Sequence, residues 1–244
     1  MTSSGFNFGP SPQSGHGLLE ASPPTAKAVQ TKPMPMDNTY VARLAIFDKG
    51  PLTPEMAKTL LTFVDDIYED LELWYPLLRL QEAGYSMRLA APELRTYTGK
   101  HGYPATSDLL LQEARSADFC GLLIPGGFMP DKLRRDAKVL ALTREFFCSG
   151  KLVAFICHGG WIPISAKILT GKRVTGSLGI KDDLENAGGV WVNEPVVVDG
   201  NLISSRTPRD LAPFAKAMVD FLQSRTGSTS CPNEVERCQA ILKP

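Results

Sequence analysis

Runs of consecutive apolar residues alternate along the middle of the chain with stretches in which apolar residues recur every three or four positions. Short unbroken apolar runs predict strands that are buried on both faces, and the three-to-four spacing predicts helices with one buried face. The expected strands are 43–47, 86–91, 119–124, 152–156, 189–192, 195–198 and 202–205. The expected helices are 53–67, a stretch from Leu71 that Gly84 closes, 107–114, 131–148, 161–169 and 209–223.

The order of these elements predicts an α/β fold. Strands that are each followed by a helix are typical of a parallel sheet with helices on both faces. The later strands are short and lie close together in the sequence, and Asp199-Gly200 between the last two is a hairpin signal. We therefore expect a three-layer α/β/α sandwich with a mainly parallel sheet and a late antiparallel hairpin.

The first expected helix, 53–67, has Thr53 as its N-cap and Pro54 in its first turn. Helical spacing places the following apolar residues on one buried face: Met56, Leu60, Phe63, Val64 and Ile67.

Both ends of the chain are polar. Residues 1–38 are rich in Ser, Pro, Gly and Thr, and they hold too little apolar surface to offset the entropy of ordering. We expect a disordered tail at 1–38, one folded domain at 39–225 and a second tail at 226–244.

Charge and cysteine content narrow the classes of function. Twenty-six basic residues balance twenty-six acidic residues in the 244-residue chain, so neither nucleic acid nor a membrane is an expected partner. No apolar run is long enough for a transmembrane helix, and no signal-peptide pattern opens the chain, so we expect a cytoplasmic protein. The five cysteines are odd in number and irregularly spaced, which suits a reducing compartment, and they and the three histidines show no metal-ligand spacing.

Two glycine-rich turns, 125–127 and 157–160, follow buried strands, and ligands of open α/β sheets bind at the carboxyl ends of the strands. Cys157 opens the second turn, where a strand passes into a helix as in a nucleophile elbow. The N-terminus of that helix favours thiolate over thiol. The alternative is a buried structural cysteine beside a hydrogen-bonded histidine, and the flanking glycines favour the functional interpretation.

His158 has two candidate roles beside this cysteine. Its imidazole can act as general base or acid, and its backbone N–H can stabilise an oxyanion. The backbone N–H of Gly127 is the candidate for the second oxyanion donor.

Several short motifs occur in a fixed order. They are Tyr-Glu-Asp-Leu-Glu-Leu at 68–73, Tyr-Pro at 75–76, Thr-Gly-Lys-His-Gly-Tyr at 98–103, Pro-Gly-Gly at 125–127, Ile-Cys-His-Gly at 156–159, Gly-Ile-Lys-Asp-Asp at 179–183, Val-Val-Asp-Gly-Asn at 197–201 and Ser-Ser-Arg at 204–206. With these motifs, the chain from 68 to about 223 resembles the PfpI-type intracellular peptidases, in the class I glutamine amidotransferase-like superfamily.

The resemblance implies a flavodoxin-like sandwich that forms homodimers or higher homo-oligomers. It implies that Cys157 is the nucleophile, in a strained backbone conformation, and that Glu69 reaches its thiol and tunes its ionisation. A protonated carboxyl can do so by donating a hydrogen bond to the thiolate. Without the resemblance Glu69 would be interpreted as a solvated helix charge, as Asp70 and Glu72 are.

The resemblance also points to a third acidic residue that orients the histidine from a neighbouring subunit. Asp131 occupies the matching position, with a shorter side chain than the usual Glu, and a helix N-cap is its alternative role. His101 is interpreted as a structural or pocket-lining residue.

Two features depart from the family pattern. An inserted helical segment, 48–67, separates the first expected strand from Glu69 and could cap the pocket, block it or alter the dimer contact. Trp161 follows the Cys-His-Gly-Gly turn, where relatives often have a smaller residue, and we expect its indole to narrow the site.

The sequence thus predicts a cofactor-free cysteine enzyme that acts on a small-molecule or peptide substrate. The candidate reactions are glyoxalase-type conversion of small electrophilic carbonyls and hydrolysis of amide or peptide bonds. The alternatives are a redox sensor or chaperone that uses an oxidisable cysteine, and a tailoring enzyme of specialised metabolism.

Overall fold

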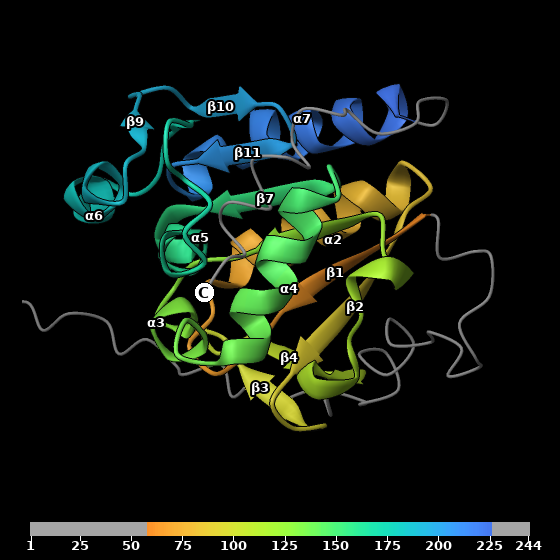
Figure 1. The fold of residues 1–244 in the computed structure, drawn as a ribbon. Helices are drawn as coiled ribbons and strands as arrows, with labels where there is room; N and C mark the ends of the chain where they lie inside the picture. Colours follow the sequence, from red (N-terminus) through yellow and green to blue (C-terminus); the bar gives the residue numbers. More distant parts are fainter. Residues whose placement is uncertain (1–57, 226–244) are drawn as a thin grey trace, which may run out of the picture. The chain divides into compact units, whose positions relative to one another are not determined.

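The computed structural model describes residues 58–225. Its main sheet contains β1 (Thr59–Phe63), β2 (Ser86–Ala91), β5 (Leu109–Leu110), β6 (Gly121–Ile124), β7 (Leu152–Ile156), β10 (Val196–Asp199) and β11 (Leu202–Ser205). The seven strands lie in the order β10-β11-β7-β6-β1-β2-β5 (Figure 1). Every neighbouring pair is parallel except β10 and β11, which form the antiparallel hairpin that the sequence predicts.

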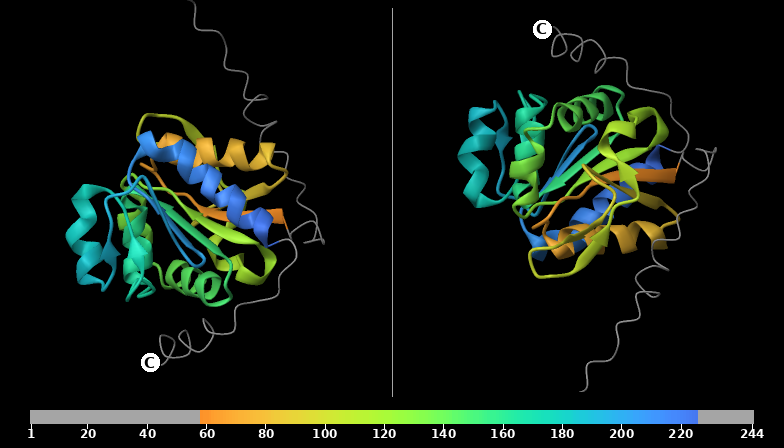
Figure 2. Two further views of the ribbon diagram at one scale, coloured as in Figure 1. Left: turned by 90° about the horizontal axis from the view of Figure 1, so that it is seen from above. Right: turned by 90° about the horizontal axis from the view of Figure 1, so that it is seen from below.

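Helices cover both faces of this sheet. They are α2 (Asp70–Glu82), α3 (Met129–Leu133), α4 (Ala137–Cys148), α5 (Trp161–Ser165), α6 (Lys181–Asn186) and α7 (Leu211–Ser224). The helices α2 and α7 pack side by side on one face, and α4 and α5 lie on the other (Figure 2). This arrangement confirms the three-layer, flavodoxin-like sandwich with a mainly parallel sheet.

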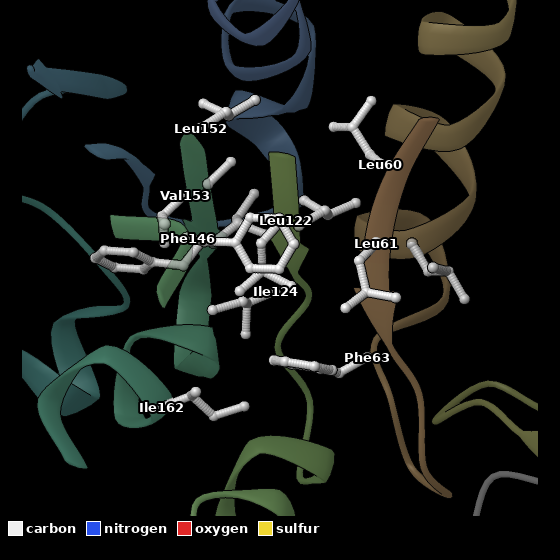
Figure 3. Close-up of a cluster of buried hydrophobic side chains, with 14 of the residues drawn as sticks. Leu60, Leu61, Phe63, Leu122, Ile124, Phe146, Leu152, Val153 and Ile162 are labelled. Atoms are coloured by element: carbon white, nitrogen blue, oxygen red, sulfur yellow. The ribbon is translucent and has the colours of Figure 1, made fainter. Parts of the chain in front are cut away.

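The core lies where the central strands meet the two helical layers. Every residue of β6 and β7 is buried, because helices cover both faces of these strands. Figure 3 shows side chains from β1, β6, β7, α4 and α5 interlocking in this core, with these residues labelled: Leu60, Leu61, Phe63, Leu122, Ile124, Phe146, Leu152, Val153 and Ile162.

Two small sheets lie outside the main one. The antiparallel pair β3 (Thr96–Thr98) and β4 (Pro104–Thr106) encloses the Gly-Lys-His-Gly loop. The parallel pair β8 (Arg173–Val174) and β9 (Val190–Trp191) lies near α6. Of these four strands only β9 is predicted from the sequence, because two- and three-residue strands carry too little periodicity to detect.

The predicted helix over 53–67 is wrong for its described part, because Thr59–Phe63 forms β1, the central strand between β6 and β2. Helical spacing accounts for the burial of Leu60 and Phe63 but not for that of Leu61 and Thr62, which are also buried. A run of consecutive buried residues is typical of a parallel strand covered on both faces. The first strand of the sheet therefore ends shortly before α2, and no inserted helix lies between this strand and Glu69.

Three other predicted helices differ from the elements observed. The segment 107–114 contains β5 and a single 3₁₀ turn instead of a helix. The helix expected at 131–148 is divided into α3 and α4, because Asp136 caps α4 by accepting a hydrogen bond from the N–H of Lys138 at 2.7 Å. The helix expected to reach 169 ends at Ser165, and Lys167 follows with a φ of 59°.

The expected strand at 43–47, the tail at 1–38, the tail at 226–244 and most of the segment 48–67 lie outside the described residues. Within 58–225 no helix is long and apolar enough to cross a membrane.

Replacing Leu122 by alanine is expected to lower the free energy of unfolding by about 2–5 kcal/mol, because the side chain is fully buried at the centre of the sheet. Leu94→Ala is the matched control, since Leu94 is 58% exposed, and it should change the value by less than about 0.5 kcal/mol. Equilibrium denaturation in guanidinium chloride measures both. Equal effects of the two substitutions would contradict the assigned core.

Candidate active site

Three loops meet at the carboxyl ends of the adjacent strands β1, β6 and β7. They are 64–69 after β1, 125–128 after β6 and 157–160 after β7. The chain continues from β1 to β2 on one side and returns to β6 on the other, so this edge is a topological switch point of the sheet. Open α/β sheets bind their ligands at such a point.

Cys157 stands at the corner between β7 and the helical segment that continues into α5. It is the first residue of a 3₁₀ turn, Cys157–Gly160, and its φ of 58° lies in the left-handed region. A non-glycine residue seldom adopts this conformation, which costs on the order of 1 kcal/mol or more and is found mainly at functional sites. The strand-to-helix corner and the strained backbone both agree with the sequence-based expectation.

The imidazole of His158 lies beside the thiol. Its Nδ1 is 3.2 Å from the Sγ of Cys157, within hydrogen-bonding distance for sulfur. The other side of the site is formed by Trp161, whose ring meets the imidazole edge-on at a centroid distance of 5.0 Å. Burial, and after it the charge of Lys100, lowers the pKa of His158, so the imidazole is neutral at pH 7.

The carboxyl group that reaches the thiol belongs to Glu72 and not to Glu69. Glu72 is fully buried, and one of its oxygens, Oε2, accepts a hydrogen bond from the N–H of Gly126 at 2.7 Å. Its carboxyl lies beside the thiol of Cys157, and the two groups affect each other's ionisation. Its other oxygen, Oε1, is buried and has no hydrogen-bond partner among the described residues. The structure therefore corrects two expectations, the contact assigned to Glu69 and the solvated position assigned to Glu72.

Glu69 has a different role. It is the N-cap of α2, and its Oε2 accepts a hydrogen bond from the N–H of Glu72 at 2.9 Å. A side chain that folds back over the first turn cannot also extend to the sulfur, whereas the residue three positions later projects toward the two glycine-rich turns. Both glutamates belong to one sequence motif. Their roles differ because α2 begins at Asp70, directly after Glu69, and the sequence alone does not locate this start.

The buried carboxyl and the thiol influence each other's ionisation. Burial, and after it the charge of Glu69, raises the pKa of Glu72 to about 8. Burial, and after it the charge of Glu72, raises the pKa of the Cys157 thiol to about 12. The direction is opposite to the lowered thiol pKa expected from the sequence, because desolvation and the charge of Glu72 outweigh the backbone hydrogen bond of His158. Below about pH 8 both groups keep their protons.

The two glycine-rich turns approach each other behind the thiol. A Cβ on Gly126 would lie 2.6 Å from Oε2 of Glu72 and 3.0 Å from both the Cβ of Cys157 and the backbone nitrogen of His158. Gly127 has a φ of 81°, and a Cβ there would lie 2.3 Å from the carbonyl oxygen of Ile67. Only glycine fits at either position, and the close approach brings the candidate oxyanion donors to one side of the sulfur.

Asp70 is buried and organises the Gly-Lys-His-Gly loop, which also contradicts the solvated position expected for it. Its carboxylate accepts hydrogen bonds from the N–H groups of His101 and Tyr103, both at 2.9 Å. A Cβ on Gly99 would lie 2.4 Å from the same carboxylate. The exposed His101 imidazole is thereby held 3.7 Å from Oε1 of Glu69, at the rim of the site.

Asp131 is not the N-cap of α3, because that helix begins at Met129 and Asp131 lies within its first turn. Its carboxylate pairs with the guanidinium of Arg135, one turn later, at 2.5 Å. Its described partner is thus on its own helix and not His158, and a role across a subunit interface stays a prediction.

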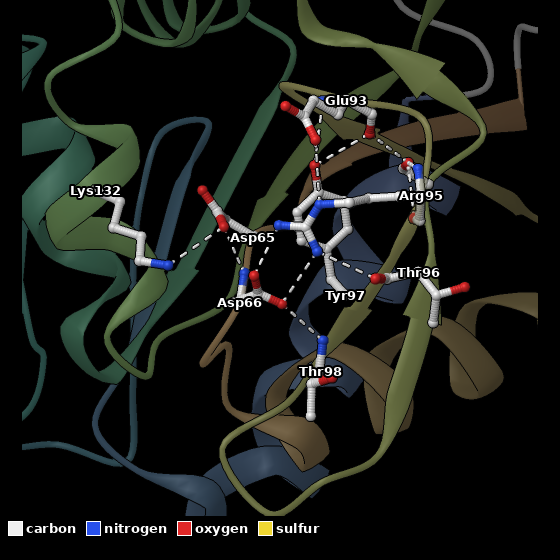
Figure 4. A network of polar contacts seen from close by, with 9 residues as sticks. Asp65, Asp66, Glu93, Arg95, Thr96, Tyr97, Thr98 and Lys132 are labelled. Carbon is white, nitrogen blue, oxygen red and sulfur yellow. Dashed lines mark hydrogen bonds and ion pairs between the residues drawn. The ribbon is translucent and has the colours of Figure 1, made fainter.

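A polar network fixes the loop between β1 and α2 (Figure 4). Asp66 accepts hydrogen bonds from the guanidinium of Arg95 at 2.7 Å and from the N–H of Thr98 at 2.9 Å. The guanidinium of Arg95 also lies over the ring of Tyr97, 3.7 Å from its centroid, and it lowers the pKa of Asp66. Because Lys132 pairs with the adjacent Asp65 at 3.4 Å, the loop is tied to both the β3–β4 hairpin and α3.

Of the cysteines in the described residues, Cys120 and Cys157 are free, whereas Cys148 is disulfide-bonded, which the odd cysteine count did not predict. Among residues 58–225, no cluster of three or more His, Cys, Asp or Glu side chains could hold a metal ion.

Comparison with known protein families agrees with this geometry. The family model described as the DJ-1/PfpI family matches residues 57–221. The chain belongs to the DJ-1/PfpI family. The matched segment begins two residues before β1, which supports β1 as the first strand of the conserved domain.

Several relatives are named as deglycases. The chain is 45% identical over 156 residues to deglycase PH1704 of Pyrococcus horikoshii, which covers 64% of this chain and 94% of that protein. It is 44% identical over 156 residues to deglycase PfpI of Pyrococcus furiosus, with the same coverage. These relatives support an enzyme of the DJ-1/PfpI family.

A solved structure has a similar fold. It is a two-domain protein from Anabaena variabilis with DJ-1/ThiJ/PfpI-like and ferritin-like domains. The TM-score is 0.67 at 33% identity, and the match covers 77% of this chain and 55% of that one.

Glu72→Gln is expected to raise the rate of Cys157 alkylation several-fold at about pH 10, because the negative charge that opposes thiolate formation is removed. Glu69→Gln is the matched comparison on the same turn and should have a smaller effect. Iodoacetamide labelling against pH, followed by mass spectrometry of the Cys157 peptide, measures both rates. A larger effect from Glu69→Gln would return the thiol contact to Glu69.

Glu72 also makes stability depend on pH. Its folded-state pKa lies above the ordinary value of 4.5, so the stability it contributes is complete below about pH 4.5 and is lost as the pH rises through about 8. Glu72→Gln is therefore expected to raise Tm more at pH 9 than at pH 5, as thermal denaturation can measure. An equal change in Tm at the two pH values would show that Glu72 has an ordinary pKa in the folded protein.

Proposed function

We propose that this protein is a cofactor-free cysteine enzyme that uses Cys157 to attack an electrophilic carbonyl carbon. The observation that carries the proposal is the convergence on one sulfur of a strained strand-to-helix corner, the His158 imidazole at 3.2 Å and the buried Glu72 carboxyl. A nucleophile within reach of a base, beside a group that controls its charge, is the arrangement that covalent catalysis requires.

The first step joins Sγ of Cys157 to the carbonyl carbon. The thiol proton passes to Nδ1 of His158, which is free to accept it because its pKa is lowered. The carbonyl π electrons move to oxygen, where the N–H groups of Gly127 and His158 are the proposed donors to the oxyanion. Glu72 is protonated below about pH 8 and lies beside the sulfur, so it can donate a hydrogen bond to the thiolate as the thiol proton leaves.

Two reactions can follow from this adduct. With a 2-oxoaldehyde, the hemithioacetal loses the proton on its carbon to a base and regains one on the neighbouring carbon, which yields a thioester. With an amide, the amine leaves with the proton from His158 and the same kind of thioester remains. Water hydrolyses the thioester in both cases and releases Cys157. The names of the Pyrococcus relatives favour small carbonyl-derived substrates.

An assembly of two or more copies is part of this proposal. Three apolar residues on one outward face of α2 support it, since they are spaced at four and three positions and are 39–56% exposed: Leu71, Tyr75 and Leu78.

A redox-sensing or chaperone role is the alternative of a different class. Sulfenic acid formation requires thiolate, and burial holds the Cys157 thiol in its protonated form at neutral pH. A raised pKa disfavours the thiolate in both roles, but the His158 imidazole, 3.2 Å from the sulfur, can remove the proton during attack on a substrate, and this contact supports the catalytic role. A tailoring reaction in specialised metabolism would use the same nucleophile with a different substrate.

Cys157→Ala is expected to abolish conversion of methylglyoxal to lactate, or hydrolysis of a peptide or amide, because it removes the bond-forming atom. The control is Cys120→Ser, which removes the other free thiol of residues 58–225 and should keep most of the activity. His158→Gln should reduce kcat about 10²- to 10⁴-fold, the usual value of a general base. Lactate formation and amine release measure the two reactions.

If Cys157→Ala retains full turnover, the nucleophile assignment is wrong. If wild type converts neither substrate class but suppresses aggregation equally well with and without Cys157, the chaperone alternative is favoured.

A further inference from the structure

The two residues that follow His158 have no side chains that could contact its imidazole. Gly159 and Gly160 follow it, and both are packed too closely to carry a side chain. A Cβ on Gly159 would lie 2.4 Å from the carbonyl oxygen of Ile124, and one on Gly160 would lie 2.8 Å from Cδ1 of Ile180. The next side chain that can contact the imidazole is therefore further along the chain.

Trp161 provides that side chain. It lies three residues after His158, and side chains three apart are eclipsed in a 3₁₀ turn such as Cys157–Gly160. The two rings meet at an interplanar angle of 67° with their centroids 5.0 Å apart, an edge-to-face contact. The imidazole is thus enclosed between the Trp161 ring and the sulfur of Cys157, 3.2 Å from Nδ1.

The indole is itself held from two other elements. Its Nε1–H donates a hydrogen bond to Oδ2 of Asp183, in α6, at 2.8 Å. The guanidinium of Arg134, just after α3, lies 5.7 Å from the centroid of the ring, and its Nε donates to the hydroxyl of Ser165 at 2.8 Å. Asp183 and Arg134 therefore restrict the positions that the Trp161 ring can adopt.

We propose that Trp161, held by Asp183, is the positioning residue that keeps Nδ1 of His158 directed at the Cys157 thiol. The inference rests on the proposed function, in which His158 removes the thiol proton. Trp161 thus orients His158 from within the same subunit. The carboxylate expected to orient His158, that of Asp131, is paired with Arg135 instead.

An aromatic ring orients the histidine in a different way from a carboxylate. It restricts the rotation of the imidazole without placing a negative charge beside it, so it acts on geometry during proton transfer. The loss of such an interaction lowers kcat and leaves substrate binding nearly unchanged.

The test uses the full chain with five substitutions. Trp161→Leu removes the ring, and Trp161→Phe keeps a ring but loses the Nε1–H donor. Asp183→Ala removes the acceptor, and Asp183→Asn retains a carbonyl oxygen in its place. Asp182→Ala is the matched control, because Asp182 is the neighbouring exposed carboxylate on the same helix.

We expect kcat to fall about tenfold in Trp161→Leu and Asp183→Ala, with KM within about twofold of wild type. Trp161→Phe should be intermediate, and Asp183→Asn and Asp182→Ala should resemble wild type. In parallel, ¹H–¹³C NMR of the free protein should show the ring signals of His158 displaced by the Trp161 ring current. That displacement should disappear in Trp161→Leu and decrease in Asp183→Ala.

Unchanged kcat and unchanged His158 ring signals in Asp183→Ala would overturn the inference, and so would an equal effect of Asp182→Ala. If Trp161→Leu does not fold, the comparison of Asp183→Ala with Asp183→Asn still tests the inference. If wild type shows no turnover, the proposed function fails, whereas the NMR signals still report whether Trp161 fixes the imidazole.

Discussion

A carboxyl group buried beyond the reach of water has to find its hydrogen-bond partners within the protein, and Glu72 imposes that requirement on the whole site. Its Oε2 accepts a hydrogen bond from the N–H of Gly126, and its carboxyl lies beside the thiol of Cys157, whereas its Oε1 has no hydrogen-bond partner among the described residues. This one side chain therefore links the start of α2, the turn after β6 and the turn after β7. The pairing of β1, β6 and β7 brings these three segments to the same edge of the sheet.

The same constraint explains the local chemistry of the sequence around the site. Because Glu72 and the carbonyl of Ile67 fill the space beside the turn after β6, Gly126 and Gly127 cannot carry side chains. Because Glu69 caps α2, the next glutamate along the motif is directed inward. Residues of one short motif thus serve two purposes, since one stabilises the helix and the other stabilises the nucleophile.

Desolvation sets the acid–base properties of this site. It raises the pKa of Glu72 and Cys157 and lowers that of His158, so all three groups are neutral near pH 7. A neutral thiol, a neutral base and a carboxylic acid that can donate a hydrogen bond suit a reaction in which charge develops only during attack. The enclosing Trp161 ring, which carries no charge, preserves this balance while it restricts the imidazole.

The sequence by itself determined the sheet-forming strands β2, β6, β7 and β11, the hairpin at Asp199-Gly200 and the corner at Cys157, because apolar runs and glycine turns are local signals. It failed at β1, where the helical spacing of Leu60 and Phe63 concealed a run of buried residues. It assigned the thiol contact to Glu69 instead of Glu72, and it predicted a lowered thiol pKa instead of a raised one. Only the tertiary structure decided these points, since burial and the direction of a side chain depend on segments far apart in the sequence.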